Sequence, residues 1–337
     1  MQKKLFIISN ERFYSEQKNF YCDNIAEKTL PDGLSKNFEV KIIGRVSSIK
    51  RAHKLNLKKI ITTNNLISYL IYICKNIRKD DTKFLVLSIS PFTFLASLIF
   101  IFSGTKPFVY LRSDGHEEYR SILGFYGPVI YSIMFNIVSK IGVFLSCREY
   151  ILKKKKGYIV YPSEINSRWT FNPKKLAIDE INLLYVGRIK VEKGIFSLLE
   201  MIKNQDKINL TILGATKDNI KKINQNNVKV FEIENNENNI IKFYDNHNIF
   251  ILPSYTEGHP MVLLEALARL RPVIVFKQIK HVIGDYEGIF ISERNSEELI
   301  KKINYIKENY EEIQERMKEN KLPTKETFLN DFIKLLS

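Results

Sequence analysis

Two cations on a short polar turn are the first residues in this sequence that could do chemistry. Arg188 and Lys193 stand in the stretch Gly-Arg-Ile-Lys-Val-Glu-Lys-Gly, between an apolar strand and an amphipathic helix. A diphosphate carries about two negative charges, and such a turn can offer it the bidentate fork of an arginine and the point charge of a lysine. A Gly-Arg dipeptide is a weak signal by itself, so solvated loop cations remain an equal alternative for this turn alone.

Two glutamates, Glu257 and Glu265, give the second candidate for chemistry. They enclose the stretch Glu-Gly-His-Pro-Met-Val-Leu-Leu-Glu, which predicts a helix that begins at Pro260 or Met261. The free N–H groups of its first turn can bind an anion or sugar hydroxyls. Glu265 would lie about one turn inside the helix, where its two oxygens could accept both hydroxyls of a ribose, while Glu257 would lie near a sugar. Because apolar residues flank Glu265, an unpaired surface carboxylate is the less favourable interpretation.

A third group of ionisable residues follows an apolar stretch in the first half of the chain. The segment Phe108–Tyr119 reads Phe-Val-Tyr-Leu-Arg-Ser-Asp-Gly-His-Glu-Glu-Tyr. At the carboxyl end of a strand, such a cluster would face a ligand crevice. His116 or Asp114 could therefore orient an acceptor hydroxyl or contact a sugar. The alternative is that Asp114 caps a helix and His116 is structural, and the sequence does not separate the two.

The elements that must position these residues alternate between strands and helices along the first half. The predicted strands are Lys4 to Asn10, Phe38 to Val46, Phe84 to Ser90, Phe108 to Ser113, Val143 to Cys147 and Tyr158 to Tyr161. The predicted helices are Asp23 to Leu30, Asn65 to Arg78, Phe92 to Phe102 and Pro128 to Lys140. Strands that alternate with helices predict crossover connections and a parallel sheet covered on both faces.

The same alternation restarts after an irregular stretch, Pro162 to Asp179. Strands are predicted at Ile181 to Val186, Ile208 to Leu213, Val228 to Ile233, Ile249 to Leu252, Pro272 to Phe276 and Gly288 to Ile291, and helices beginning near Gly194, Lys217, Asn238, Met261 and Ser296. The sequence thus predicts an α/β protein of two Rossmann-like, doubly wound domains, residues 1–162 and 163–323, facing across a cleft. The tail, residues 324–337, predicts a helix that could pack back onto the first domain.

Charge divides the chain unevenly. Residues 1–160 carry 26 Lys and Arg against 12 Asp and Glu, whereas residues 161–337 carry 26 against 25. A basic half indicates an anionic partner, either a membrane surface or nucleic acid. The apolar stretches Phe92–Phe102 and Pro128–Phe144 and the run Lys153–Lys156 would suit a domain resting on a membrane, although core helices and a solvated loop are the simpler interpretation. The three cysteines are expected to be reduced thiols. The start of the chain reads as a strand and not as a signal peptide, and no apolar run has the length of a membrane span. We therefore expect a cytoplasmic protein, which the basic half could attach peripherally to the inner face of the membrane.

The two motifs of the second half, Gly-Arg-x-x-x-Glu-Lys-Gly and Glu-Gly-x-x-x-x-x-x-Glu-Ala, resemble the retaining GT-B glycosyltransferases of family 4, over residues 181 to about 292. The resemblance implies a nucleotide-diphosphate sugar as donor, with Arg188 and Lys193 on its diphosphate, Glu265 on its ribose and Glu257 near its sugar. The other positions expected at the donor are Gly187, Gly214, Gly258, His259, Pro260, Met261 and Val262. It also implies metal-independent chemistry without a cofactor, and the chain contains no Asp-x-Asp triplet.

Two departures from that family stand in the sequence. Many relatives have Gly-Phe-Gly after the first glutamate, where this chain has Gly258-His259-Pro260, and a glycine-rich loop after the first strand is replaced by Ser-Asn-Glu-Arg. We expect a transferase of cell-surface glycan assembly that acts on a lipid-linked or polysaccharide acceptor. The alternatives are a nucleotide-sugar epimerase of the same architecture and a nucleic-acid-binding protein, but no recognition helix or base-stacking motif supports the latter.

Overall fold

The computed structural model describes residues 2–57, 59–77, 82–174, 176, 178, 180–216, 220, 223–232, 234 and 236–337. The chain forms two compact units. One runs up to Pro162 and also includes Glu326–Ser337, and the other comprises Ser163–Lys325. Each unit has its own sheet and its own hydrophobic core.

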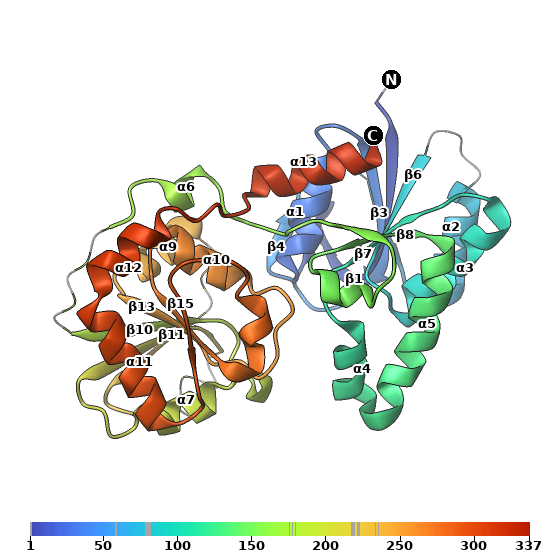
Figure 1. The fold of residues 1–337 in the computed structure, drawn as a ribbon. Helices are drawn as coiled ribbons and strands as arrows, with labels where there is room; N and C mark the ends of the chain where they lie inside the picture. Colours follow the sequence, from blue (N-terminus) through green and yellow to red (C-terminus); the bar gives the residue numbers. More distant parts are fainter. Residues whose placement is uncertain are drawn as a thin grey trace. The chain divides into compact units, whose positions relative to one another are not determined.

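In the described residues, the first unit is built on a nine-stranded sheet (Figure 1). Its strands are β1 (Lys4–Glu16), β2 (Asn19–Cys22), β3 (Glu39–Val46), β4 (His53–Leu55), β5 (Ile60–Thr63), β6 (Thr82–Leu87), β7 (Phe108–Leu111), β8 (Val143–Ser146) and β9 (Gly157–Ile159). The parallel strands have the order β5-β3-β1-β6-β7-β8-β9, while β2 pairs antiparallel with the far end of β1 and with β4. The strand order reverses between β1 and β6, which is where such sheets bind ligands.

The helices of the first unit cover both faces of this sheet. They are α1 (Ile25–Leu34), α2 (Leu66–Ile77), α3 (Pro91–Ser103), α4 (Gly115–Leu123), α5 (Gly127–Ile141) and α13 (Lys325–Leu336). One core contains buried side chains of α2, α3 and α5, such as Ile73, Phe100 and Phe135. The other contains Leu34 of α1 and Phe332 of α13. Successive residues of β1 alternate between the two cores, as the pleat of a strand requires.

The C-terminal helix α13 packs on the first unit although it follows the second in the sequence. The ring of Phe332 lies 5.0 Å from that of Tyr110 in β7, edge to face. Leu329 lies against Gly33 of α1, where a Cβ would come within 2.5 Å of the leucine side chain. Leu336 is fully buried in the same core. This helix therefore completes one face of the first unit.

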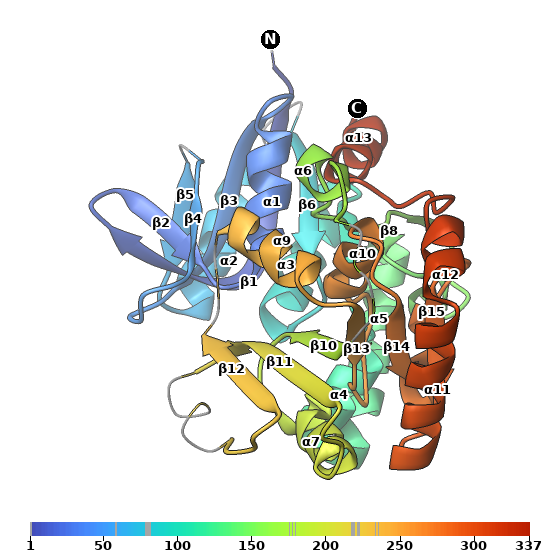
Figure 2. The same ribbon diagram turned by 90° about the vertical axis from the view of Figure 1, so that its left-hand side faces the viewer.

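The second unit has a six-stranded parallel sheet in its described residues (Figure 2). The strands are β10 (Ile181–Val186), β11 (Ile208–Ala215), β12 (Val228–Glu232), β13 (Ile249–Leu252), β14 (Val273–Phe276) and β15 (Ile289–Ser292). Their order is β12-β11-β10-β13-β14-β15, which again reverses once, between β10 and β13. Every residue of β13 and β14 is buried, because helices cover both faces of a parallel sheet.

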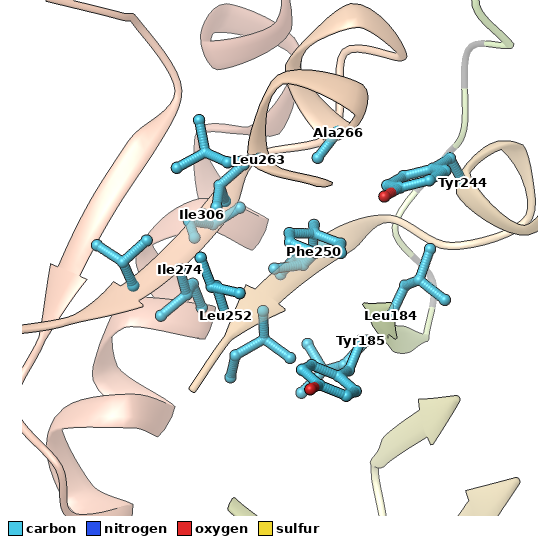
Figure 3. Close-up of a cluster of buried hydrophobic side chains, with 14 of the residues drawn as sticks. Leu184, Tyr185, Tyr244, Phe250, Leu252, Leu263, Ala266, Ile274 and Ile306 are labelled. Atoms are coloured by element: carbon cyan, nitrogen blue, oxygen red, sulfur yellow. The ribbon is translucent and has the colours of Figure 1, made fainter. Parts of the chain in front are cut away.

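The helices of the second unit pack around these strands. They are α6 (Ser167–Thr170), α7 (Ile195–Ile202), α9 (Glu237–Asp245), α10 (Met261–Ala268), α11 (Ser296–Glu308) and α12 (Tyr310–Met317). Figure 3 shows the centre of their core, where Phe250 of β13 lies between Tyr244 of α9 and the helix that carries Leu263 and Ala266. The predicted helix near Lys217 begins outside the described residues.

Two features of the first unit differ from the sequence-based expectations. β1 continues to Glu16 instead of ending at Asn10, because Phe13 is buried against Gly44 of β3. The strands β2, β4 and β5 were not predicted, because none of the three segments is an all-apolar run like the one that identified β13, which is equally short.

The helical segment Gly115–Ile141 is long and apolar enough to cross a membrane by its length and hydropathy, a span that the sequence analysis did not predict. The chain, however, turns at the 3-10 helix Gly124–Tyr126, and the Cα of Gly127 packs directly on the backbone of Tyr119. The inner side of α5 buries residues such as Phe135 in the sheet core. The segment is therefore a helical hairpin on the sheet and not one continuous helix.

Candidate functional site

A pocket of about 330 Å³ lies at the carboxyl ends of β10, β11 and β13, where the strand order of the second sheet reverses. Among its lining residues are four predicted positions from the first two strand ends, namely Gly187, Arg188, Lys193 and Gly214. The segment before α10 and the start of that helix contribute five more, namely Glu257, His259, Pro260, Met261 and Val262. Two motifs about seventy residues apart in the sequence thus meet around one pocket, because the carboxyl ends of neighbouring parallel strands share an edge.

Glycines let the backbone come close together on the first side of this pocket. Gly187 and Gly214 have φ angles of +155° and +116°, and a Cβ on Gly214 would lie 2.6 Å from the carbonyl oxygen of Gly187. The amide of Gly187 donates to the carbonyl of Leu213 at 2.8 Å. The hydroxyl of Tyr185 donates to the carbonyl of Arg188 at 2.9 Å and so holds the turn that carries the arginine. Both glycines are therefore required by backbone shape and not only by ligand access.

Gly194 joins the two motifs directly. Its φ is +67°, and a Cβ there would lie 1.9 Å from the carbonyl oxygen of Pro253, at the start of the second motif. The amide of Tyr255 donates to the carbonyl of Glu192 at 2.9 Å. The turn after β10 and the loop after β13 are thus fixed against each other before any ligand binds.

Lys193 and Glu257 form an ion pair inside the pocket. The lysine Nζ lies 2.7 Å from Oε1 of the glutamate, and the exposed fractions of the two side chains are 23% and 11%. The hydroxyl of Ser254 donates to the same oxygen at 2.6 Å. Arg188 is exposed, and its side chain forms no hydrogen bond or ion pair with the part of the chain that the structure describes. The pocket therefore offers one positioned lysine and one unengaged guanidinium to an anionic ligand.

The amino end of α10 forms the other wall of the pocket. The helix spans Met261–Ala268 after Pro260, and no side chain caps its first turn. The first N–H groups of an uncapped helix remain available to a ligand and carry the positive end of the helix dipole. Gly258 lies in the loop before the helix but is not among the lining residues of the pocket.

Glu265 lies one turn inside α10 and is not among the residues that line the pocket, and its expected contact with a ribose stays a prediction. Its Oε2 accepts a hydrogen bond of 2.8 Å from the hydroxyl of Tyr244, which comes from α9. Burial raises the pKa of Glu265 to about 7, although the hydrogen bond from Tyr244 acts in the opposite direction. One carboxylate oxygen is thus engaged within the protein, which the sequence could not show because Tyr244 belongs to another helix.

Comparison with known proteins identifies this region. Residues 167–322 match the family described as glycosyl transferases group 1. We call residues 167–322 the group 1 domain, after the family that they match. An uncharacterised glycosyltransferase of Haemophilus influenzae is 31% identical over 160 residues, which cover 42% of this chain and 44% of that protein. The chain therefore matches less than half the length of this relative.

Two further similarities extend beyond the group 1 domain. The N,N'-diacetylbacillosaminyl-diphospho-undecaprenol alpha-1,3-N-acetylgalactosaminyltransferase of Campylobacter jejuni is 24% identical over 250 residues, which cover 71% of this chain and 58% of that enzyme. The crystal structure of Anabaena HepE in complex with UDP matches 99% of both chains, with a TM-score of 0.72 and 12% identity. The chain has the GT-B fold, and the pocket described above lies within the group 1 domain.

The two candidates from the first half, Asp114 and His116, lie outside the group 1 domain at the start of α4. Asp114 caps this helix, because its Oδ1 accepts from the amide of His116 at 3.0 Å, and its Oδ2 lies 2.8 Å from Nζ of Lys153. Burial acts to raise the pKa of Asp114, but Lys153 and the amide hold it below its ordinary value. The His116 ring packs edge to face on Tyr131 and Phe135, and burial lowers its pKa. Asp114 thus has the structural role of a helix cap. A role of Asp114 or His116 in catalysis stays a prediction.

The reversal point of the first sheet holds an ion pair that the sequence analysis missed. Oε1 of Glu27, on α1, lies 3.0 Å from Nη2 of Arg112, which follows β7, and Glu27 is only 1% exposed. The other oxygen of Glu27, Nη1 of Arg112 and Oδ1 of Asn10 are buried and have no hydrogen-bond partner within the described residues. A helix residue such as Glu27, in Ile-Ala-Glu-Lys-Thr, carries no local signal of this burial.

The pocket also contains residues that were not singled out from the sequence. Glu234 and Ile240 line it from the loop after β12 and from α9, and Tyr185 and Leu252 line it from the strands. Glu234 belongs to the loop between β12 and α9. In the described residues no three His, Cys, Asp or Glu side chains gather in a way that could hold a metal ion.

Proposed function

We propose that this protein transfers a sugar from a nucleotide-diphosphate sugar to a lipid-linked or polysaccharide acceptor, with retention of configuration and without a metal ion. The observation that carries the proposal is the convergence of Arg188, Lys193 and the uncapped amino end of α10 on one pocket of the group 1 domain. These are the positive groups that a diphosphate leaving group requires. The likeness to a structure that contains UDP supports the same ligand class.

Each charged group has a distinct task in this proposal. Arg188 binds the diphosphate through its fork, since no described residue competes for it. Lys193 reaches the diphosphate as a point charge, and Glu257 holds its ammonium in place from 2.7 Å. Because Glu257 partly neutralises the lysine, most of the uncompensated charge at the leaving group comes from Arg188 and the dipole of α10.

The reaction needs no covalent bond between enzyme and sugar. The bond between the anomeric carbon and the diphosphate oxygen breaks first, and its electron pair stays on the leaving phosphate. Arg188, Lys193 and the amides of α10 stabilise this negative charge more strongly than the charge of the intact donor. The acceptor hydroxyl then attacks from the same face, and its proton goes to the departing phosphate. Glu257 acts as a positioning group in this scheme.

The acceptor is expected on the first unit. The sheet reversal there presents the buried pair Glu27–Arg112, whose remaining hydrogen-bonding atoms could bind sugar hydroxyls. The Campylobacter relative is named for an undecaprenol-linked acceptor, and we infer a comparable lipid-linked or polysaccharide acceptor in cell-surface glycan synthesis. An enzyme that acts on such acceptors would lie in the cytoplasm, at the inner face of the membrane.

Donor binding is the first test of this proposal. The protein is screened by thermal shift against UDP-, GDP- and ADP-sugars with a metal chelator present, since a bound donor stabilises the folded state. We expect a shift from one nucleotide class in the wild type, a much smaller shift in Arg188→Ala, and an unchanged shift in Lys190→Ala, which alters a cation of the same turn outside the pocket. Equal shifts in all three proteins, or none, would contradict it.

Product analysis separates the alternatives. An epimerase changes the stereochemistry of the sugar without an acceptor, whereas a transferase releases nucleoside diphosphate in proportion to glycosylated acceptor. A nucleic-acid-binding protein would instead bind RNA or DNA with steep salt dependence and ignore nucleotide sugars.

A further inference from the structure

The hairpin of α4 and α5 carries a long uncharged segment. Residues 121–139 read Ser-Ile-Leu-Gly-Phe-Tyr-Gly-Pro-Val-Ile-Tyr-Ser-Ile-Met-Phe-Asn-Ile-Val-Ser, nineteen positions without a charged side chain. In a chain with 26% charged residues, such a run needs an explanation beyond average composition. Burial explains only the inner side of α5, where Tyr131, Met134, Phe135 and Val138 join the core.

Most large apolar side chains in the rest of this segment are exposed. Phe125 and Tyr126, at the turn of the hairpin, are 86% and 73% exposed, and Ile122 beside them is 72% exposed. The outer side of the hairpin adds Leu123, Val129, Ile130 and Ile133, each at least 43% exposed. These seven residues, which we call the apolar tip, all lie between Ile122 and Ile133 in the sequence. A soluble protein rarely leaves such a patch open unless it binds a partner.

The hairpin is held rigid beneath the apolar tip. A Cβ on Gly127 would lie 2.0 Å from the carbonyl oxygen of Tyr119, so the two helices are as close as their backbones allow. A Cβ on Gly115 would overlap the ring of Tyr131, which joins the base of α4 to α5 in the same way. Figure 1 shows the two helices as neighbouring arms that meet at the turn. The exposed side chains are thus presented by a fixed scaffold.

A basic loop adjoins the base of the hairpin. Nζ of Lys153 lies 2.8 Å from Oδ2 of Asp114, the residue that caps α4. Three further lysines follow, Lys154, Lys155 and Lys156, and Lys154 and Lys156 are exposed. Tyr158, in β9 directly after this loop, is 53% exposed. Lysines and tyrosines beside an apolar surface are the groups that favour the headgroup region of an anionic bilayer.

We propose that the apolar tip inserts into the interfacial layer of an anionic lipid bilayer, and that Lys154–Lys156 bind its headgroups. The hairpin does not span the bilayer, because the inner side of α5 belongs to the core of the first unit. Charge complementarity favours an anionic bilayer, and not a second copy of the chain, as the partner of the apolar tip, because two basic first halves would repel each other. α4 starts directly after β7, so docking brings the carboxyl edge of the first sheet, with Glu27 and Arg112, toward the lipid surface.

Vesicle binding tests the apolar tip without any donor or acceptor. The full chain is sedimented with vesicles of phosphatidylcholine and phosphatidylglycerol in a ratio of about 3:1, and with pure phosphatidylcholine. We expect binding to the anionic vesicles, and a loss of about tenfold or more in the partition coefficient for Phe125→Asp/Tyr126→Asp. The matched control is Phe171→Asp, which places the same charge at an aromatic residue of the second unit that is 77% exposed, and it should cost at most the small effect of one added charge.

The lysines give a second, independent variant. Lys154→Gln/Lys156→Gln should weaken binding to the anionic vesicles by about fivefold for each lysine and leave the weak binding to pure phosphatidylcholine unchanged. Circular dichroism and thermal melting of each variant establish that it is folded. Because these measurements use no sugar nucleotide, failure of the donor assays would not affect them.

Three results would overturn the inference. The first is no binding of the wild type to anionic vesicles, and the second is equal binding by the wild type and the Phe125/Tyr126 variant. The third is dimerisation in analytical ultracentrifugation that the tip variant abolishes, which would assign the surface to a second copy of the chain.

Discussion

Nζ of Lys193 lies 2.7 Å from Oε1 of Glu257, across 64 positions of sequence. This contact joins the two motifs of the group 1 domain and sets the lysine at the wall of the donor pocket. It also means that the lysine does not meet the diphosphate as an isolated charge. The pair separates two tasks, because one partner can bind the leaving group while the other orients it.

Removing either partner should therefore have different effects. Lys193→Ala is expected to lower kcat/KM for sugar transfer by about 100-fold, because it deletes a group that stabilises the departing phosphate. Glu257→Gln keeps a hydrogen-bond acceptor but no counter-charge, so we expect donor binding within about threefold of wild type and a larger loss in kcat. Steady-state kinetics over donor concentration measure both. Equal losses of donor affinity in the two variants would contradict this division.

Gly194 should be intolerant of any side chain. Gly194→Ala places a Cβ 1.9 Å from the carbonyl oxygen of Pro253, so we expect a loss of about 2 kcal/mol or more in the free energy of unfolding, with a weakened donor site. Gly104→Ala is the matched control, since Gly104 has the same φ of +67° but no atom within 4 Å of a Cβ. Gly104→Ala should lower the free energy of unfolding only by the backbone strain of a positive φ, about 1 kcal/mol. Equal unfolding midpoints in urea for the two variants would show that the contact with Pro253 is not tight.

Glu265 should make the donor-free protein less stable as the pH rises. Its pKa is raised from 4.5 to about 7, so between these values the folded state holds a proton that the unfolded state has released. The stabilisation that the protonated Glu265 gives to the folded state is complete below its pKa in the unfolded chain. It is lost as the pH rises through its pKa in the folded protein. Glu265→Gln should remove this dependence and raise the melting temperature relative to wild type by about 3 °C or more at pH 8.

The measurement is the difference in melting temperature between Glu265→Gln and wild type, taken from about pH 4 to about pH 8. A difference that does not grow with pH would refute the protonated state of Glu265. Ribose hydroxyls that donate to the carboxylate would favour its ionised form, so wild-type donor affinity should rise with pH over the same range.

Asp114 should contribute to stability through its cap and its ion pair. Its pKa is depressed, so this stabilisation is present above the ordinary value of 3.8 and is lost as the pH falls through the folded pKa. Asp114→Ala is expected to cost about 1 kcal/mol or more of unfolding free energy at neutral pH. Asp114→Ser retains a capping oxygen without the charge. It should keep most of the stabilisation from the helix cap and lose the stabilisation from the ion pair with Lys153. If Asp114→Ser folds normally yet loses sugar transfer, the residue acts on a substrate.

Sequence patterns predicted the elements whose signal is local. The buried runs of β10 and β13 read as strands because all-apolar segments of that length fit a parallel sheet, and their shared edge brought the motifs together. The same reasoning failed for contacts made by side chains from unrelated elements. Nothing near Glu265 indicates that Tyr244 of α9 binds it, and nothing near Glu27 indicates burial beside Arg112.

Local propensity also misjudged the first unit where packing overrides it. α4 begins at Gly115, a residue unfavourable in helices, because any Cβ there would overlap the ring of Tyr131. The apolar stretch Pro128–Phe144 was interpreted first as a core helix, with a membrane-bound surface as the alternative. Only its place on the outside of a hairpin reveals that much of it is exposed.

Calorimetric titration of the donor pocket tests the central claim most directly. The nucleotide that gives the largest thermal shift is titrated, as its diphosphate and with a chelator present, into wild type, Arg188→Ala, Lys193→Ala and Lys190→Ala. The account predicts tight binding to wild type and Lys190→Ala, and affinities at least about tenfold weaker for the two pocket variants. Undiminished binding of the nucleoside diphosphate by both Arg188→Ala and Lys193→Ala would contradict it.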